Sequence, residues 1–149
     1  MKELFANYNE IIRALWWNQP YASLMLHGKI ETRTYPTNVR GKVLICACKK
    51  RYDLGTIMTI SGRNQFDRMN TILQDGEAAI TGKAIAIGDL VDCRRMTLRD
   101  ADKCFVEFHA SRWCWIFENV QAIEPFEIKG KQGWAILDEA TKNKIHIIK

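Results

Sequence analysis

The 149-residue chain lacks the features that would place it among membrane, secreted or metal-binding proteins. No apolar run approaches the ~20 residues of a membrane-spanning helix. The first ten residues, MKELFANYNE, lack the apolar stretch of a signal peptide. The three histidines are scattered, and the five cysteines are odd in number with no Cys-x-x-Cys spacing. We therefore expect a cytoplasmic protein with no membrane partner, no metal and no disulfide framework.

Signatures of common enzyme chemistry are also missing. Ser23 has no Gly-x-Ser-x-Gly context, which argues against serine-hydrolase chemistry. The glycines show neither a Rossmann nor a P-loop spacing, so no nucleotide cofactor is expected. The sequence contains no internal repeats and no low-complexity segments.

The composition is that of one soluble globular domain spanning residues 1–149, and its charge permits an anionic partner. Hydrophobic residues make up 47% of the chain, enough for a core at this length. The net charge of +5 allows nucleic acid as a partner, although many basic proteins bind none. Basic residues recur where strands are expected to end, as at 49–51 and 94–95. The oligomeric state is left open.

Residues 19–47 form the most informative stretch. Pro20 suits the first turn of a helix, and Gly28 suits its end. The alternation that follows predicts a strand over 30–35 with Glu31 and Arg33 on one face, roughly 7 Å apart. A loop over 36–41 then leads to a strand over 42–48, which is apolar at nearly every position and therefore expected at the centre of a sheet.

Weaker patterns cover the rest of the chain. Strands are predicted over 11–17, 80–93 and 112–121, with the glycines of the second indicating bulges or curvature. A helix is predicted around 66–73, and an exposed helix or loop over 97–109. The core then spans about 11–134, after a lead-in over 1–10. The remainder, 135–149, is predicted to form a helix over 135–143 and an edge strand over 144–149.

The stretch 19–47 resembles a known family. The order Gln-Pro-aromatic-Ala-Ser-Leu, then Gly-Lys-Ile-Glu-x-Arg-Thr-aromatic-Pro-Thr, then Arg-Gly before an apolar strand is similar to the ASCH domain (activating signal cointegrator homology) of the PUA-like superfamily. Segments 80–91 and 113–134 resemble later parts of that domain. The resemblance implies an α+β fold, a small and mostly antiparallel PUA-like β-barrel with a few peripheral helices. The family motif is usually Gly-x-Lys-x-x-Glu-x-Arg. Here it is two residues shorter, so Glu31 and Arg33 align with it and Lys29 has no unique counterpart.

Three functions remain open at this point. The first is a nucleic-acid- or nucleotide-binding module for RNA or a modified nucleoside, in a cleft between 28–41 and the turn at 129–133. Glu31 and Arg33 would recognise the base, with phosphate held by cations and aromatic side chains near the ligand. The candidate binding residues are Trp17, Tyr21, Lys29, Glu31, Arg33, Tyr35, Arg40 and Lys129. Trp113 and Trp115 are instead expected in the core.

The second function is implied by the resemblance, because some family members are small amidohydrolases that remove an acyl group from a modified cytidine. They use a lysine, a threonine and a glutamate. Here Lys29, Thr32 (or Thr34) and Glu31 supply those residue types, so an N4-acylated cytidine is the expected substrate. The third function is a protein-interaction domain without catalysis.

Overall fold

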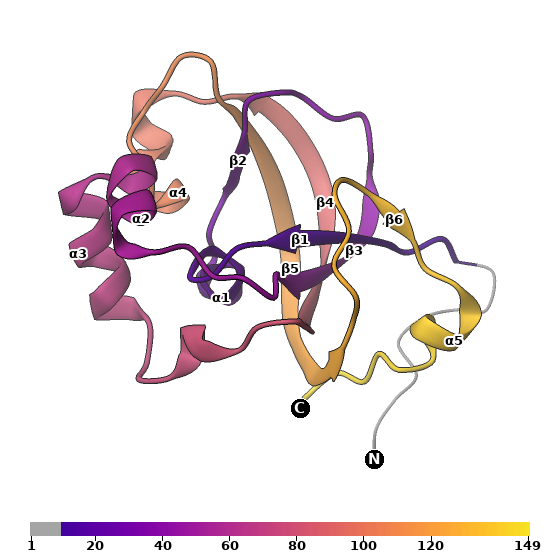
Figure 1. Cartoon of the computed structure of the whole chain (residues 1–149). Helices are drawn as coiled ribbons and strands as arrows, with labels where there is room; N and C mark the ends of the chain where they lie inside the picture. Colours follow the sequence, from indigo (N-terminus) through magenta and orange to yellow (C-terminus); the bar gives the residue numbers. More distant parts are fainter. Residues whose placement is uncertain (1–9) are drawn as a thin grey trace.

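The structure is a computed structural model, and it describes residues 10–149 (Figure 1). One six-stranded sheet curls into a half-barrel, with strand order β2-β5-β4-β3-β1-β6. The strands are β1 (Arg13–Trp17), β2 (Glu31–Arg33), β3 (Gly41–Ala47), β4 (Lys83–Arg95), β5 (Trp113–Glu127) and β6 (Ala135–Ile136). Of the lead-in expected over 1–10, residues 1–9 lie outside the described part of the chain.

The sheet is mixed, which refines the expectation of a mostly antiparallel barrel. β1 and β3 pair in parallel, from Arg13 with Val43 to Trp17 with Ala47, whereas the other neighbouring strands are antiparallel. Parallel strands need a crossover. Here the crossover contains β2, which joins the far edge of the sheet through β5.

Short helices gather at one side of the sheet (Figure 1). They are α1 (Tyr21–Leu24), α2 (Leu54–Ser61), α3 (Arg63–Ile72) and α4 (Ala101–Cys104), while α5 (Glu139–Lys142) lies near the C-terminus. A 3₁₀ turn, Met25–His27, extends α1, and Gly28 ends it with a φ of 82°, as the sequence predicts. The helix predicted around 66–73 is confirmed as α3. The preceding helix α2 was not predicted, although Asp53 caps it by accepting a hydrogen bond from the Thr56 N–H.

Two predictions for local structure hold only in part. Segment 97–109 forms the short helix α4 and a loop, opens with a capping box at Thr97 and is largely exposed, but Cys104, Phe105 and Val106 are buried in the core. The helix predicted over 135–143 begins too early. Residues 135–136 pair with β1 as β6, so α5 begins only after Asp138, which caps it. The expected edge strand over 144–149 makes only an isolated bridge between Ile123 and Ile147.

The sheet is buried on both faces. The larger cluster, under α1 to α4, includes Leu15, Trp17, Ile45 and Trp115, and the smaller one on the opposite face includes Leu44. β3 contributes alternate side chains to both clusters, which confirms it as a central strand. Trp115 is fully buried, as expected, whereas Trp113 is only partly buried and packs under Arg95, 4.4 Å from ring centroid to guanidinium carbon.

Candidate functional site

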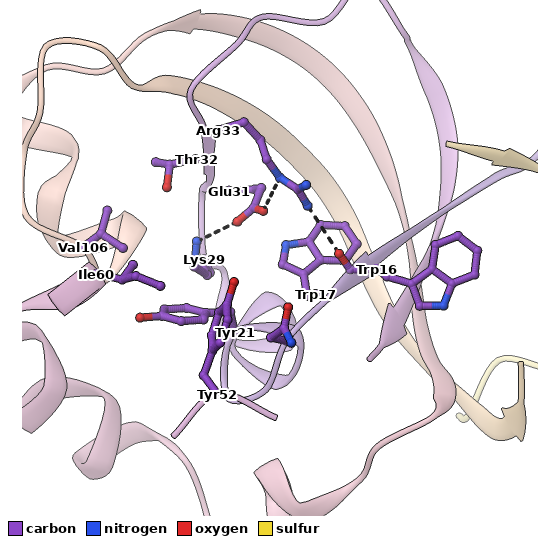
Figure 2. Close-up of a pocket in the computed structure, with 11 residues that line it drawn as sticks. Trp16, Trp17, Tyr21, Lys29, Glu31, Thr32, Arg33, Tyr52, Ile60 and Val106 are labelled. Atoms are coloured by element: carbon purple, nitrogen blue, oxygen red, sulfur yellow. Dashed lines mark hydrogen bonds and ion pairs between the residues drawn. The ribbon is translucent and has the colours of Figure 1, made fainter. Parts of the chain in front are cut away.

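A pocket of about 560 Å³, including its open mouth, lies at the ends of β1 and β2 (Figure 2). Glu31 and Arg33 line it together, as their shared strand face predicts. Aromatic side chains form its walls. The full lining is Trp16, Trp17, Asn18, Tyr21, Lys29, Glu31, Thr32, Arg33, Tyr52, Ile60 and Val106.

The pocket contains a buried network of three charged side chains. The Glu31 carboxylate accepts a hydrogen bond from Lys29 Nζ at 3.0 Å and from Arg33 Nε at 2.8 Å (Figure 2). The side chains of Lys29, Glu31 and Arg33 are 1%, 8% and 21% exposed, respectively. This network is therefore shielded from water, unlike a surface ion-pair ladder.

Backbone contacts fix the network in place. Glu31 pairs with Trp115 and Arg33 with Trp113 where β2 joins the edge of β5. Just before β2, the Lys29 N–H donates to the Leu24 carbonyl, and the Ile30 N–H donates to the Lys103 carbonyl. The turn after α1 and the end of α4 thus hold β2 and the residues just before it, which together carry all three charges.

The charges hold each other in the ionised state. Burial alone would raise the pKa of Glu31, but the positive charges of Lys29 and Arg33 outweigh it and leave the pKa below its ordinary value. For Arg33, burial would lower the pKa, and the Glu31 carboxylate reverses this so that the pKa is raised. Glu31 is therefore a fixed carboxylate and Arg33 a fixed guanidinium at neutral pH.

Arg33 is also held by aromatic rings. Its guanidinium carbon lies 5.6 Å from the centroid of Trp17 and 5.4 Å from that of Trp115, which is within cation–π range. One of its NH₂ groups points at the Trp16 carbonyl, 3.5 Å away. Trp115 in turn stacks on Trp134 with centroids 5.7 Å apart. These contacts restrict the guanidinium to one orientation.

The Trp17 indole N–H is buried in the pocket wall without a hydrogen-bond partner among the described residues. It lies near the Glu31 carboxylate and helps to lower the pKa of Glu31, but the geometry falls short of a hydrogen bond. Trp17 is only 3% exposed, so this donor is not satisfied by bulk water. Buried polar groups are nearly always paired, so this N–H is an exception that calls for an explanation.

Tyr21 completes the wall beneath Lys29. Its hydroxyl hydrogen-bonds the Ser61 hydroxyl, and its ring lies 5.6 Å from Lys29 Nζ. Burial raises the pKa of Tyr21, so the phenol is neutral at physiological pH. Tyr52 packs edge-on against Tyr21, with ring centroids 6.0 Å apart, and extends the aromatic wall.

The structure gathers six of the predicted site residues and leaves three outside. Trp17, Tyr21, Lys29, Glu31, Thr32 and Arg33 all line the pocket. Tyr35 is half exposed and packs edge-on against Trp115. Arg40 is exposed and donates to the carbonyls of Thr37 and Val39 in its own loop. Lys129 lines a separate groove.

The pocket is lined by residues of segment 28–41 but by none of the expected turn at 129–133. The second wall of the pocket comes from three other segments. Tyr52 follows β3, Ile60 lies in α2, and Val106 follows α4. Sequence analysis missed these residues because α2 and the buried segment after α4 were not predicted. The apolar run Cys104–Val106 was the one available signal for a buried segment there.

No group of three or more His, Cys, Asp or Glu side chains suitable for a metal ion occurs within residues 10–149. The five cysteines are free, although the sulfurs of Cys104 and Cys114 lie 3.9 Å apart. Within the same residues, none of the helices has the length and apolar character needed to cross a membrane.

No protein-family model matches this chain, and a search of curated proteins finds no match.

Proposed function

We propose that this chain is an ASCH-type module of the PUA-like superfamily that binds one base of RNA, or a modified nucleoside, in the pocket. The observation that carries this proposal is the buried network of Lys29, Glu31 and Arg33 beside the unpartnered indole N–H of Trp17. A buried ion network is weak evidence for a role in stability. At the floor of an open pocket, fixed charges of this kind are typical of a functional site.

The pocket offers what a base edge needs. The Glu31 carboxylate has acceptor capacity beyond its two ion pairs and suits an exocyclic amino group. The Trp17 N–H and the ammonium group of Lys29 lie beside it as donors for a ring nitrogen or a carbonyl. Neighbouring donors and acceptors are the pattern of a Watson–Crick edge, which is accessible only in an unpaired or flipped base.

Aromatic walls supply the second requirement. Tyr21, Tyr52 and Trp17 line the same pocket, and contact between a base and an aromatic side chain contributes roughly 1–3 kcal/mol per base. These walls accept any base, so the polar groups on the floor would determine which base or modification is preferred.

Amide hydrolysis of an N4-acylated cytidine is the second candidate, because Lys29, Glu31 and Thr32 line one pocket. A lysine acts as a nucleophile or base only in its neutral form. Here Nζ donates to the Glu31 carboxylate and, at 3.0 Å, to the Ile30 carbonyl. Both contacts use Nζ as a hydrogen-bond donor and hold it against Glu31 and the backbone, so we rank base binding first. Chromatographic detection of cytidine released from N4-acetylcytidine distinguishes the two functions.

The proposal is tested by calorimetric titration with the common nucleoside 5′-monophosphates and a panel of modified nucleosides. At least one member should bind, and Trp17→Phe should weaken that binding by about tenfold, the effect of losing one buried hydrogen bond of about 1.4 kcal/mol. Phe keeps the aromatic ring beside Arg33 and removes the indole N–H, which makes no hydrogen bond within the described residues but lies near Glu31.

Trp113→Phe is the matched control, since Trp113 does not line the pocket. If no compound binds the parent protein, or if Trp17→Phe and Trp113→Phe bind equally well, base binding in this pocket is wrong.

A further inference from the structure

A second concave surface lies on the other side of β1 from the pocket. This basic groove has a volume of about 800 Å³, including its open mouth. Its aromatic floor is Trp16 and Phe126, and its cations are Lys129, Lys131 and Lys144. Figure 2 shows the Trp16 side chain pointing away from the pocket, opposite to Trp17.

The lysines of the basic groove are available to an anion. All three are exposed, and for Lys129 and Lys131 no carboxylate of the described residues lies within ion-pair distance. Lys144 Nζ sits over the Phe126 ring, 5.9 Å from its centroid. Two carboxylates, Glu127 and Asp138, also line the groove. Asp138 caps α5, where it accepts a hydrogen bond from the Thr141 N–H, and its pKa is lowered mainly by this cap and also by the nearby charge of Lys144.

The basic groove and the pocket meet at Trp16, which lines both. β6 pairs only with Arg13 and Ala14, so it stops short of this point on β1. There the Trp16 carbonyl faces the guanidinium of Arg33 instead of another strand. The pocket and the basic groove therefore share Trp16 as a common boundary at the edge of β1.

The segment between β5 and β6 connects the basic groove with the surroundings of Arg33. It carries Lys129 and Lys131 at the groove, and it ends at Trp134, which stacks on Trp115 behind Arg33.

We propose that the basic groove binds the sugar–phosphate backbone of the nucleotides that flank the base in the pocket, so that the ligand is a single-stranded nucleic acid and not a free nucleoside. This inference rests on the proposed function. Lysine ammonium groups act as point charges for phosphate, and partly buried aromatic side chains such as Trp16 and Phe126 are suitable contacts for unstacked bases. An acidic protein segment would match the lysines but not the continuity with the pocket.

The test compares the parent protein with Lys129→Ala/Lys131→Ala/Lys144→Ala. A fluorescein-labelled, mixed-sequence RNA decamer is titrated at several salt concentrations, and the nucleoside 5′-monophosphates and N4-acetylcytidine are titrated separately. If each lysine contacts one phosphate, the triple variant should lower the salt slope by about 2. Between about 50 and about 200 mM salt, the parent should then lose about 20-fold more affinity than the variant.

The matched control is Arg63→Ala/Arg99→Ala/Lys103→Ala, which removes the same charge from exposed positions on the side of the sheet away from β6 and α5. It should keep the parent's salt slope, and both triple variants should bind the single nucleosides as the parent does.

The remaining outcomes separate the two proposals. If the lysine variant keeps the parent's salt slope for the decamer while nucleosides still bind, the groove proposal is wrong and base binding in the pocket stands. If the lysine variant loses decamer binding while Trp17→Phe does not, and no nucleoside binds, base binding in the pocket is wrong and the groove binds nucleic acid without it. If polyglutamate binds the groove and RNA does not, the groove proposal is overturned.

Discussion

Replacing Glu31 by Gln tests whether the buried charge network contributes to the free energy of unfolding. The substitution keeps the size of the side chain and an acceptor oxygen but removes the negative charge between Lys29 and Arg33. At the 3.0 Å separation of Lys29 and Glu31, two unit charges in an effective dielectric constant of about 20 attract by roughly 5.5 kcal/mol. The Lys29 side chain is 1% exposed, so water cannot replace the lost partner.

The expected loss of unfolding free energy is about 3 kcal/mol, near the lower end of the ~3–5 kcal/mol measured when a buried pair is broken, because Gln retains a neutral hydrogen bond. For a domain of this size that loss lowers the melting temperature by about 6–12 °C. Urea unfolding at pH 7 followed by circular dichroism measures it directly.

The contribution of the Lys29–Glu31 pair to stability is measured by a double-mutant cycle that combines Glu31→Gln with Lys29→Met. Once Lys29 is gone, losing the Glu31 charge should cost less, and we expect a coupling energy of at least ~1.5 kcal/mol. The matched control is the Arg63–Asp67 pair, whose side chains are 76% and 60% exposed, with an expected coupling of roughly 0.5 kcal/mol or less. If the two cycles give the same coupling, the network behaves as a surface ion pair and the argument fails.

The pH dependence gives a second check. The folded pKa of Glu31 lies below its ordinary value of 4.5, so its contribution to stability is fully present above that value and is lost as the pH falls through the folded pKa. In the Gln variant this contribution is absent at every pH. The stability difference between parent and variant should therefore shrink below pH ~4.5. A difference that stays constant down to pH 3 would contradict the pKa shift.

Three further predictions concern other parts of the molecule. Gly88→Ala should destabilise the protein by about 1–3 kcal/mol in urea unfolding, because its Cβ would lie 2.8 Å from Val120 Cγ2, and Val120→Ala in the same chain should recover part of the loss. Native protein should react slowly with a thiol reagent at Cys46, whose pKa is raised by burial, and all five thiols should titrate after denaturation unless a disulfide forms. Arg33→Lys should change which base is preferred without changing the salt slope for an oligonucleotide, since lysine keeps the charge but loses the fixed guanidinium plane between Trp17 and Trp115; an altered slope with unchanged preference would identify Arg33 as a phosphate contact.

Local sequence rules predicted the part of the site that lies on one short segment. Gly28 ends the helix, alternation sets Glu31 and Arg33 on one face, and the apolar run over 42–48 is a central strand, all from neighbouring residues. These features depend on backbone geometry and on periods of two and 3.6 residues. They are therefore readable without knowledge of the tertiary fold.

The rest of the site depends on contacts between distant segments, and sequence periodicity carries no information about these. Val106 reaches the pocket because the segment after α4 is buried against the core, although its charged neighbours suggested exposure. Lys129 was placed in the cleft because it follows a strand, but β5 delivers it to the opposite side of β1. The parallel pairing of β1 with β3 likewise arises from a crossover that no local pattern specifies.

The shortened spacing of the Gly-Lys-x-Glu-x-Arg stretch has a physical consequence that an aligned motif does not show. With Lys29, Glu31 and Arg33 at alternate positions, all three side chains project to the same side of one extended segment. One carboxylate then contacts a cation on each side, at 3.0 and 2.8 Å. In the pattern Gly-x-Lys-x-x-Glu-x-Arg, the lysine and the glutamate are three positions apart and would fall on opposite faces of an extended segment. The short spacing thus places Lys29 in an ion pair with Glu31. A fixed ion pair of this kind is expected at the bottom of a binding pocket.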